Sequence, residues 1–149
     1  MATSSLKAPV TRVMALDYGT QKMGMASGVV LGHVVTPLGI LPMQNGNPDW
    51  STLIAQIGEQ GVTLVLVGLP LHMDGSESAL SLRSRKFARR LLHKLKEQRI
   101  SIDVALIDER LSSRSAKDRL KAHAKVDAEA AALLIESYWV QPTHVEVLP

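Results

Sequence analysis

Acidic residues follow two predicted strands, and another opens a predicted helix. Asp17 comes directly after the apolar run at residues 13–16 and just before a glycine, which is typical of the exit of a buried strand. Asp108 and Glu109 follow a second apolar run, and Asp127 stands where the last helix is expected to begin. Burying a lone carboxylate costs several kcal/mol unless a cation or hydrogen-bond donors meet it. A cation is therefore expected wherever these carboxylates meet.

A divalent metal ion would make such a meeting of carboxylates stable. Three carboxylates in one crevice repel one another, and Mg²⁺ and Mn²⁺ prefer oxygen ligands. Two such ions about 4 Å apart can activate a water molecule and stabilise the leaving oxygen when a phosphodiester bond is cleaved. The acidic residues therefore favour metal-dependent hydrolysis of a phosphodiester.

Each acidic residue also has a simpler interpretation. Asp17 could be a turn residue, and Glu109 could pair with a neighbouring arginine at the surface. Asp127 taken alone is best read as a helix N-cap. Asp108 and Glu109 point to opposite sides of an extended chain, so only one of them is expected to face a shared site. The residues by themselves leave open which one.

Composition excludes several other kinds of chemistry. The chain of 149 residues has no cysteine, which excludes disulfides, cysteine-bound zinc and thiol catalysis. Its five histidines are scattered without ligand spacing, and no serine lies in a nucleophile motif. No apolar run approaches the roughly 20 residues of a membrane span, and residues 1–9 do not resemble a signal peptide. We expect a cytoplasmic protein that binds no membrane.

Positive charge is concentrated in one part of the chain. The formal net charge is +3, yet 14 of the 17 lysines and arginines lie within residues 83–125. Such a cluster is typical of phosphate binding, although a basic helix face can also serve solubility alone. The chain has one Phe, two Tyr and two Trp, too few for an extended base-stacking surface. If the ligand is a nucleic acid, the expected phosphate contacts are Lys22, Arg110 and Lys125 beside the carboxylates and Arg83, Lys86, Arg90 and Lys94 along a helix.

The first half of the chain predicts an antiparallel meander followed by a helix and a parallel strand. Strands are expected at residues 11–16, 23–30 and 34–40, and Pro37 places the third strand at an edge of the sheet. The helix that follows is expected to have Asn47 and Pro48 as its cap and first position and to stop at Gly61. The next apolar run, residues 63–67, has the length of a buried parallel strand.

The second half predicts a long basic helix, a strand and two further helices. The long helix is expected from about residue 77 to 98, and Glu97 is the only acid between residues 83 and 99, so its cations should not be paired along their own helix. A strand at residues 102–107 precedes a short basic helix capped by Ser112 or Ser113, and Asp127 opens the last helix. Carboxyl ends of parallel strands share one edge of a sheet, where sites form. Asp17 and one residue of the 108–109 pair should therefore meet there.

Four blocks of the sequence resemble one known family. They are ALDYGTQKMGMASG at residues 15–28, VGLPLHMDGSES at 67–78, DERLSSRSA at 108–116 and KVDAEAAALLIESYW at 125–139. All four, in this order and at this length, are similar to the YqgF family, also called RuvX-like, of Holliday junction resolvases and pre-16S rRNA nucleases. The resemblance covers almost the whole chain, from about residue 13 to 139.

The resemblance implies an RNase H-like α/β fold with a mixed five-stranded sheet flanked by helices. We expect one domain over residues 1–149, with a core at about 11–140 and loose tails at 1–10 and 141–149. The family's proposed metal-binding nuclease residues match Asp17, Glu109 and Asp127 of this sequence, which selects Glu109 over Asp108. Mg²⁺ or Mn²⁺ would be the cofactor.

The family's name covers more than one substrate. Precursor rRNA and branched DNA are both implied, and a resolvase that nicks two strands symmetrically would act as a homodimer, whereas an rRNA nuclease could be a monomer. A non-catalytic RNA-binding factor for ribosome maturation or transcription is the alternative, with the same basic helices and a vestigial acidic trio. A phosphotransferase of the actin-like class, suggested by residues 17–20, would need a second domain for which the chain has no room.

Overall fold

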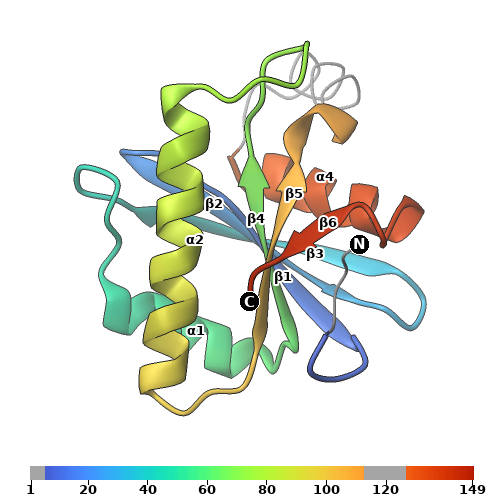
Figure 1. The fold of residues 1–149 in the computed structure, drawn as a ribbon. Helices are drawn as coiled ribbons and strands as arrows, with labels where there is room; N and C mark the ends of the chain where they lie inside the picture. Colours follow the sequence, from blue (N-terminus) through green and yellow to red (C-terminus); the bar gives the residue numbers. More distant parts are fainter. Residues whose placement is uncertain (1–5, 113–126) are drawn as a thin grey trace.

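A computed structural model describes residues 6–112 and 127–149, except for the side chains of residues 111, 112 and 127. A mixed sheet is flanked by helices on both faces (Figure 1). The elements in chain order are β1 (Arg12–Asp17), β2 (Lys22–Val29), β3 (Val34–Pro42), α1 (Trp50–Gln60), β4 (Leu64–Leu69), α2 (Ala79–Glu97), β5 (Asp103–Asp108), the 3₁₀ turn η1 (Glu109–Ser112), α4 (Asp127–Val140) and β6 (Val145–Val147).

The sheet has the strand order β3-β2-β1-β4-β5-β6. The first three strands form the predicted antiparallel meander, and β1, β4 and β5 run parallel to one another. β3 lies at an edge, as Pro37 predicts, and the register between β2 and β3 shifts at Met25 and Ala26. The three parallel strands therefore end at one edge of the sheet, which is the geometry that the site requires.

A sixth strand corrects the prediction of a five-stranded sheet with a loose C-terminal tail. Val145–Val147 pairs antiparallel with β5, so that Ala105 lies opposite Val147 and Ile107 opposite Val145. Three residues are too few to show a periodicity in the sequence. This strand exists because the free edge of β5 offers it backbone partners, and that edge is a property of the assembled sheet.

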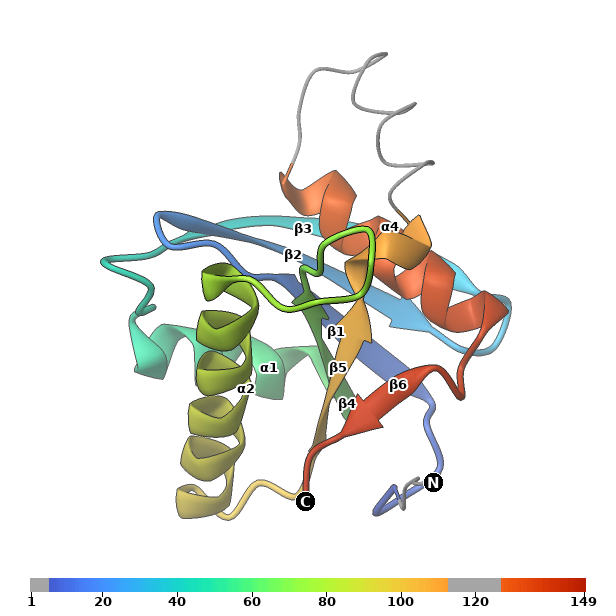
Figure 2. The ribbon, with the colours of Figure 1, turned by 45° about the horizontal axis from the view of Figure 1, so that its top comes forward.

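Two apolar clusters hold the helices against the sheet. Alternate strand residues such as Met14 and Leu16 pack with α1 and α2 on one face, and residues such as Val13 and Ala15 pack with α4 on the other. Figure 2 shows the resulting three layers, with α4 crossing the opposite face of the sheet from α2. Gly28 on β2 allows this approach, because a Cβ there would lie 2.8 Å from Cγ2 of Ile135 on α4.

The helix ends lie close to their predicted positions. Asp49 caps α1 by accepting a hydrogen bond from the Thr52 N–H, so the expected cap at Asn47 and Pro48 is two residues too early. Gly61 ends α1 at φ 63°, as predicted. α4 begins at Asp127, also as predicted. The short basic helix expected after Ser112 or Ser113 lies outside the described residues, and none of the described helices is long and apolar enough to cross a membrane.

Candidate active site

The alternation of side chains along the strands decides which acidic residues face α4. Ala15 packs on the α4 side of the sheet, so Asp17, two residues further along β1, belongs to that side too. Asp108, the last residue of β5, continues the opposite face occupied by Leu106. Glu109, the first residue of η1, lies against Gly68, which is on the α4 side because Leu66 packs there. Strand geometry therefore brings Glu109, rather than Asp108, to the side of Asp17.

Strand register then places Asp17 and Glu109 close together across β4. Leu16 pairs with Val67, and Gly68 pairs with Ile107, so Gly68 lies between the two acidic positions at the end of the sheet. A Cβ on Gly68 would clash with Oε2 of Glu109 and would lie only 3.1 Å from its Cγ and Cδ. The Glu109 carboxylate therefore fills the space that a side chain at position 68 would occupy.

Gly68 is a residue of the site that the sequence analysis missed. The sequence predicts a strand only over residues 63–67, whereas β4 extends to Leu69 and includes Gly68. The available signal was a glycine inside a strand that otherwise consists of leucine and valine, because such a glycine often marks the close approach of another group.

The two carboxyl groups perturb each other. Burial raises the pKa of Glu109 to about 8, and the negative charge of Asp17, a hydrogen bond with Asp17 and the charge of Asp108 act in the same direction. Two carboxylates this close share a proton at neutral pH, or a cation replaces the proton. This donor set of carboxylate oxygens fits a hard divalent cation such as Mg²⁺ or Mn²⁺.

Asp108 is engaged elsewhere. Its carboxylate accepts hydrogen bonds from Nε of Arg110 at 3.1 and 3.2 Å and from Nη2 at 2.8 Å. Arg110 also donates through Nη1 to the carbonyl oxygen of Met73 at 3.0 Å, which ties the loop after β4 to the end of β5. Arg110 therefore pairs with Asp108 and holds the loop after β4. A phosphate that contacts Arg110, as the sequence predicts, would have to do so without breaking these contacts.

Asp127 is at the start of α4, where the sequence predicts the third metal ligand, but its side chain lies outside the described part of the structure. α4 starts at Asp127 and packs against η1, the turn that carries Glu109. Among the side chains that the structure describes, no group of three or more His, Cys, Asp or Glu residues could hold a metal ion. Two of the three predicted ligands, Asp17 and Glu109, have described side chains and lie together, and the third ligand stays a prediction.

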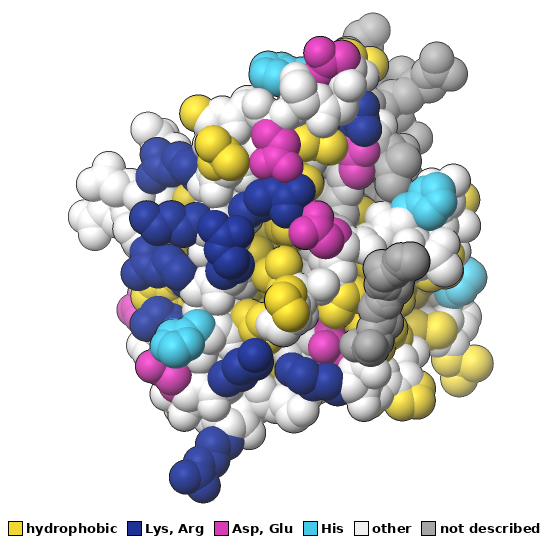
Figure 3. Space-filling model, in the orientation of Figure 1, with side chains coloured by type: hydrophobic (Ala, Val, Ile, Leu, Met, Phe, Trp, Pro, Cys, Tyr) yellow, Lys and Arg dark blue, Asp and Glu magenta, His cyan; other side chains and the backbone are white. Residues whose placement is uncertain are grey.

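The predicted phosphate-binding residues of α2 lie together on its outer side. Figure 3 shows lysine and arginine side chains gathered over this helix. Arg83 donates to the Asn45 carbonyl oxygen at 2.9 Å, and Arg90 donates to Oδ1 of Asn47 at 3.0 Å. Of the remaining candidates, Lys86 and Lys94 also line this surface, Lys22 opens β2, and Lys125 lies outside the described residues.

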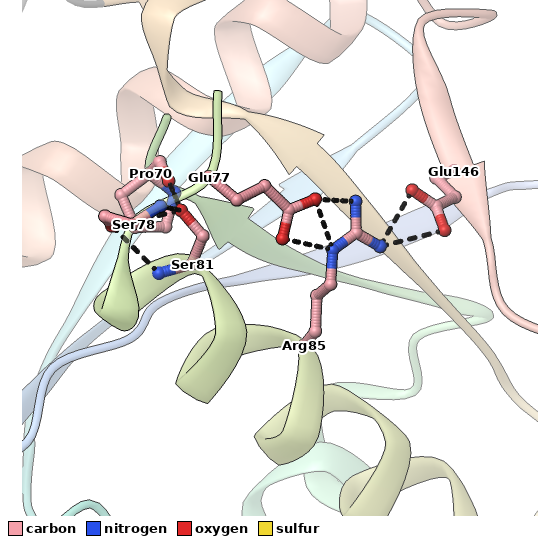
Figure 4. A network of polar contacts seen from close by, with 6 residues as sticks. All are labelled: Pro70, Glu77, Ser78, Ser81, Arg85 and Glu146. Carbon is pink, nitrogen blue, oxygen red and sulfur yellow. Dashed lines mark hydrogen bonds and ion pairs between the residues drawn. The ribbon is translucent and has the colours of Figure 1, made fainter. Parts of the chain in front are cut away.

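Arg85 is paired with carboxylates outside α2, which agrees with the expectation that the lysines and arginines of α2 find no partner along their own helix. Its guanidinium lies 2.7 Å from the Glu77 carboxylate, just before the helix, and 3.0 Å from that of Glu146 in β6 (Figure 4). His93 also lies 3.1 Å from Glu97. Glu146 could not be anticipated as a partner of Arg85, because it belongs to the strand that the sequence did not predict.

Comparison with known proteins finds a family model and relatives whose names all refer to nucleases or resolvases. The sequence model of the family described as RuvX, Holliday junction resolvase, matches residues 11–141. A protein of Acinetobacter baylyi named "Putative pre-16S rRNA nuclease" is 45% identical over 142 residues, covering 90% of this chain and 93% of that protein. A protein of Escherichia coli (strain SE11) with the same name is 36% identical over 137 residues, covering 87% and 96%.

A solved structure shares the fold at low sequence identity. Thermus thermophilus RuvC in complex with Holliday junction substrate superimposes with a TM-score of 0.61 at 14% identity, covering 93% of this chain and 99% of that chain. The expected RNase H-like α/β architecture is thereby confirmed, with one more strand than predicted.

Proposed function

Because the chain belongs to the RuvX family of Holliday junction resolvases, we propose that it hydrolyses phosphodiester bonds of structured nucleic acid in a metal-dependent reaction. The observation that carries the proposal is the contact between the Asp17 and Glu109 carboxyl groups at the edge where the parallel strands end. A protein without a use for a cation gains nothing from holding two acids against each other, because their repulsion lowers stability.

The proposed roles follow from the donor set. Asp17, Glu109 and Asp127 would hold Mg²⁺ or Mn²⁺, which when bound supplies an activated water and stabilises the leaving oxygen. Gly68 leaves room for the Glu109 carboxylate. Arg110 holds Asp108 away from this pair, so that the site presents one carboxylate from each strand end rather than two from β5.

We propose precursor rRNA or branched DNA as the substrate. The names of the relatives point to the precursor of 16S rRNA, and the RuvC complex shows that this fold can accommodate a four-way junction. The whole chain would act as one domain in the cytoplasm. A monomer would suffice for trimming an rRNA end, whereas symmetric cleavage of a junction would require a homodimer.

The test compares wild-type protein with the Asp17→Asn and Glu109→Gln variants on a precursor rRNA end fragment, a four-way junction and a plain duplex, in Mg²⁺ and in Mn²⁺. We expect each substitution to lower the cleavage rate by on the order of 10³-fold, because metal ions contribute several kcal/mol to such reactions. The matched control is Asp74→Asn, which removes an exposed carboxylate from the loop after β4. It should leave cleavage within about twofold of wild type.

Two outcomes would contradict the proposal. Asp17→Asn protein that retains metal-dependent cleavage would show that the carboxylate pair is not the catalytic centre. Tight RNA binding by the wild type with no cleavage of any substrate in either metal would favour the non-catalytic RNA-binding factor instead.

A further inference from the structure

A second concave site lies beside α2, on the face of the sheet opposite the Asp17–Glu109 pair. It is a pocket of about 310 Å³ with three cationic residues, Arg83, Lys86 and Arg90, among its lining residues. Its lining also includes Tyr18 and Phe87, whose side chains are only 6% and 3% exposed. The site therefore combines buried aromatic rings with exposed cationic side chains. We call it the α2 pocket.

The wall of the α2 pocket is held in place by hydrogen bonds. The Tyr18 hydroxyl donates to the Gly46 carbonyl oxygen at 3.0 Å, and the neighbouring carbonyl oxygen, of Asn45, accepts from Arg83. Gly46 has φ 82°, and a Cβ at this position would lie 2.7 Å from Nη2 of Arg83 and closer still to the Tyr18 hydroxyl. The turn at residues 44–47 is therefore shaped to bring backbone and cations together, which reduces the ordering cost of binding a ligand.

The cations of the α2 pocket differ from Arg85, on the same helix, in having no carboxylate partner among the described residues. Glu77 and Glu146 neutralise Arg85, whereas no carboxylate among the described residues lies within ion-pair distance of Arg83, Lys86 or Arg90. Three positive charges that converge on a concave surface repel one another and attract an anion. The α2 pocket is therefore built to receive negative charge.

The α2 pocket continues into a shallower surface along the helix. Arg90 and Lys94 lie over the Trp50 ring, with Cζ and Nζ at 5.6 and 5.3 Å from its centroid, so the ring supports their stems. Lys86, Arg89 and Lys94 line the outer surface that runs on from the pocket. Figure 3 shows this continuity as a row of basic side chains over α2. A strand that starts in the α2 pocket would find further cations for its next phosphates.

We propose that the α2 pocket binds the terminal phosphate of a nucleic-acid strand. A terminal phosphate carries close to two negative charges at neutral pH, and an internal phosphodiester carries one, so three uncompensated cations favour the end. The proposal rests on the proposed function for its substrate class and adds recognition of the strand end to it.

The test measures binding without cleavage, in EDTA, by fluorescence anisotropy at fixed ionic strength. Single-stranded 12-nucleotide RNAs carry a 5′-phosphate, a 3′-phosphate or hydroxyl groups at both ends, and adenosine monophosphate is the free-nucleotide competitor. We expect one phosphorylated end to bind about tenfold more tightly than the hydroxyl-ended RNA, the gain of one charge-assisted contact. Lys86→Gln should abolish this preference, and Lys96→Gln, on an exposed position of the same helix outside the pocket, should retain it.

The outcomes separate this proposal from the nuclease assignment. A preference that depends on Lys86 supports it, even if the protein cleaves nothing. Equal binding of all three RNAs overturns it, as does competition by adenosine monophosphate with no difference among the RNAs, which would assign the α2 pocket to a free nucleotide. Arg83→Gln serves as a second pocket variant, with circular dichroism to show that it is folded. If neither pocket variant changes the preference, the phosphate is bound elsewhere.

Discussion

Gly68 and Glu109 show how much of the site depends on single residues. The carboxylate of Glu109 occupies the volume that any side chain at position 68 would need. β4, which carries Gly68, is hydrogen-bonded to β1 on one side and β5 on the other, so its backbone has little freedom to move. A larger residue at position 68 must therefore displace the Glu109 carboxylate.

We predict that Gly68→Ala lowers the cleavage rate by about 10–100-fold, because displacing a catalytic group by about 1 Å has this effect. The matched control is Gly58→Ala in α1, where a Cβ meets nothing within 4 Å. That control should retain full activity and gain roughly 0.5–1 kcal/mol of stability, since alanine favours the helix. Rates in Mn²⁺ and urea unfolding measure both effects. Full activity of Gly68→Ala would show that the position of Glu109 does not matter.

The raised pKa of Glu109 predicts how the stability of the metal-free protein changes with pH. Its pKa is raised from 4.5 to about 8 in the folded state, first by burial and then by Asp17. Below pH 4.5 the Glu109 carboxyl is protonated in both the folded and unfolded states, so it does not change the free energy of unfolding. As pH rises toward 8 the unfolded chain loses the proton first, so folding stability falls, and above pH 8 the loss is complete.

We therefore expect the Tm of wild-type protein in EDTA to fall between pH 5 and pH 8 more than that of Glu109→Gln. At pH 8 the variant should be the more stable by a few degrees, and added Mg²⁺ should raise the Tm of the wild type alone. Differential scanning fluorimetry across this range gives the measurement. Parallel pH profiles for the two proteins would show that Glu109 ionises normally.

At the scale of elements, the start of α2 is anchored to the end of β4. Ser78 and Ser81 form a capping box in which each backbone N–H donates to the other's hydroxyl, and the Ser81 hydroxyl also donates to the Pro70 carbonyl oxygen (Figure 4). These contacts fix the helix that carries the α2 pocket relative to the strand that carries Gly68.

We predict that Ser81→Ala lowers the free energy of unfolding by about 1–2 kcal/mol, because it leaves the half-buried Pro70 carbonyl oxygen and Ser78 N–H without the hydroxyl of Ser81 as a partner. Ser84→Ala, one turn further, is the matched control. Ser84 is also 0% exposed, but its hydroxyl has no partner among the described residues, so its removal should be neutral or stabilising. Urea unfolding of both variants tests this, and equal losses would contradict it.

At the scale of the molecule, the acidic pair and the basic helix lie on different faces of one sheet and are joined by the end of β1. Asp17 faces α4, and the next residue, Tyr18, lines the α2 pocket. A nucleic acid that reaches both must therefore pass around the edge where the parallel strands end. Its hold on the protein would come from the phosphates, because aromatic residues are few.

We expect the logarithm of the binding constant for duplex nucleic acid to fall linearly with the logarithm of salt concentration, with a slope of about −3 to −4 if Arg83, Lys86, Arg90 and Lys94 each contact one phosphate. Lys94→Gln should reduce the slope by about 1. Arg12→Gln, at the opposite end of β1 from Asp17, should leave it unchanged. A slope near zero, or equal effects of the two substitutions, would exclude this surface as the binding face.

The sequence by itself determined the kind and order of the predicted elements that the structure describes and the positions of the acidic residues along them. These follow from local patterns: apolar runs with the length of strands, helical spacing in α2, and carboxylates where strands end. α4 starts at Asp127 as predicted, and Pro37 lies in an edge strand, because helix starts and edge placement are also read from local sequence.

Only the tertiary structure decided which side chains meet. It gave Gly68 its role, paired Arg85 with Glu146 and added β6 to the sheet. It also brought Glu109 against Asp17, a choice between Glu109 and Asp108 that local patterns left open and only the family resemblance indicated. Each of these depends on register between segments that are far apart in the chain, and a shift of one residue in any strand would send its side chains to the other face. No local pattern in the sequence carries that information.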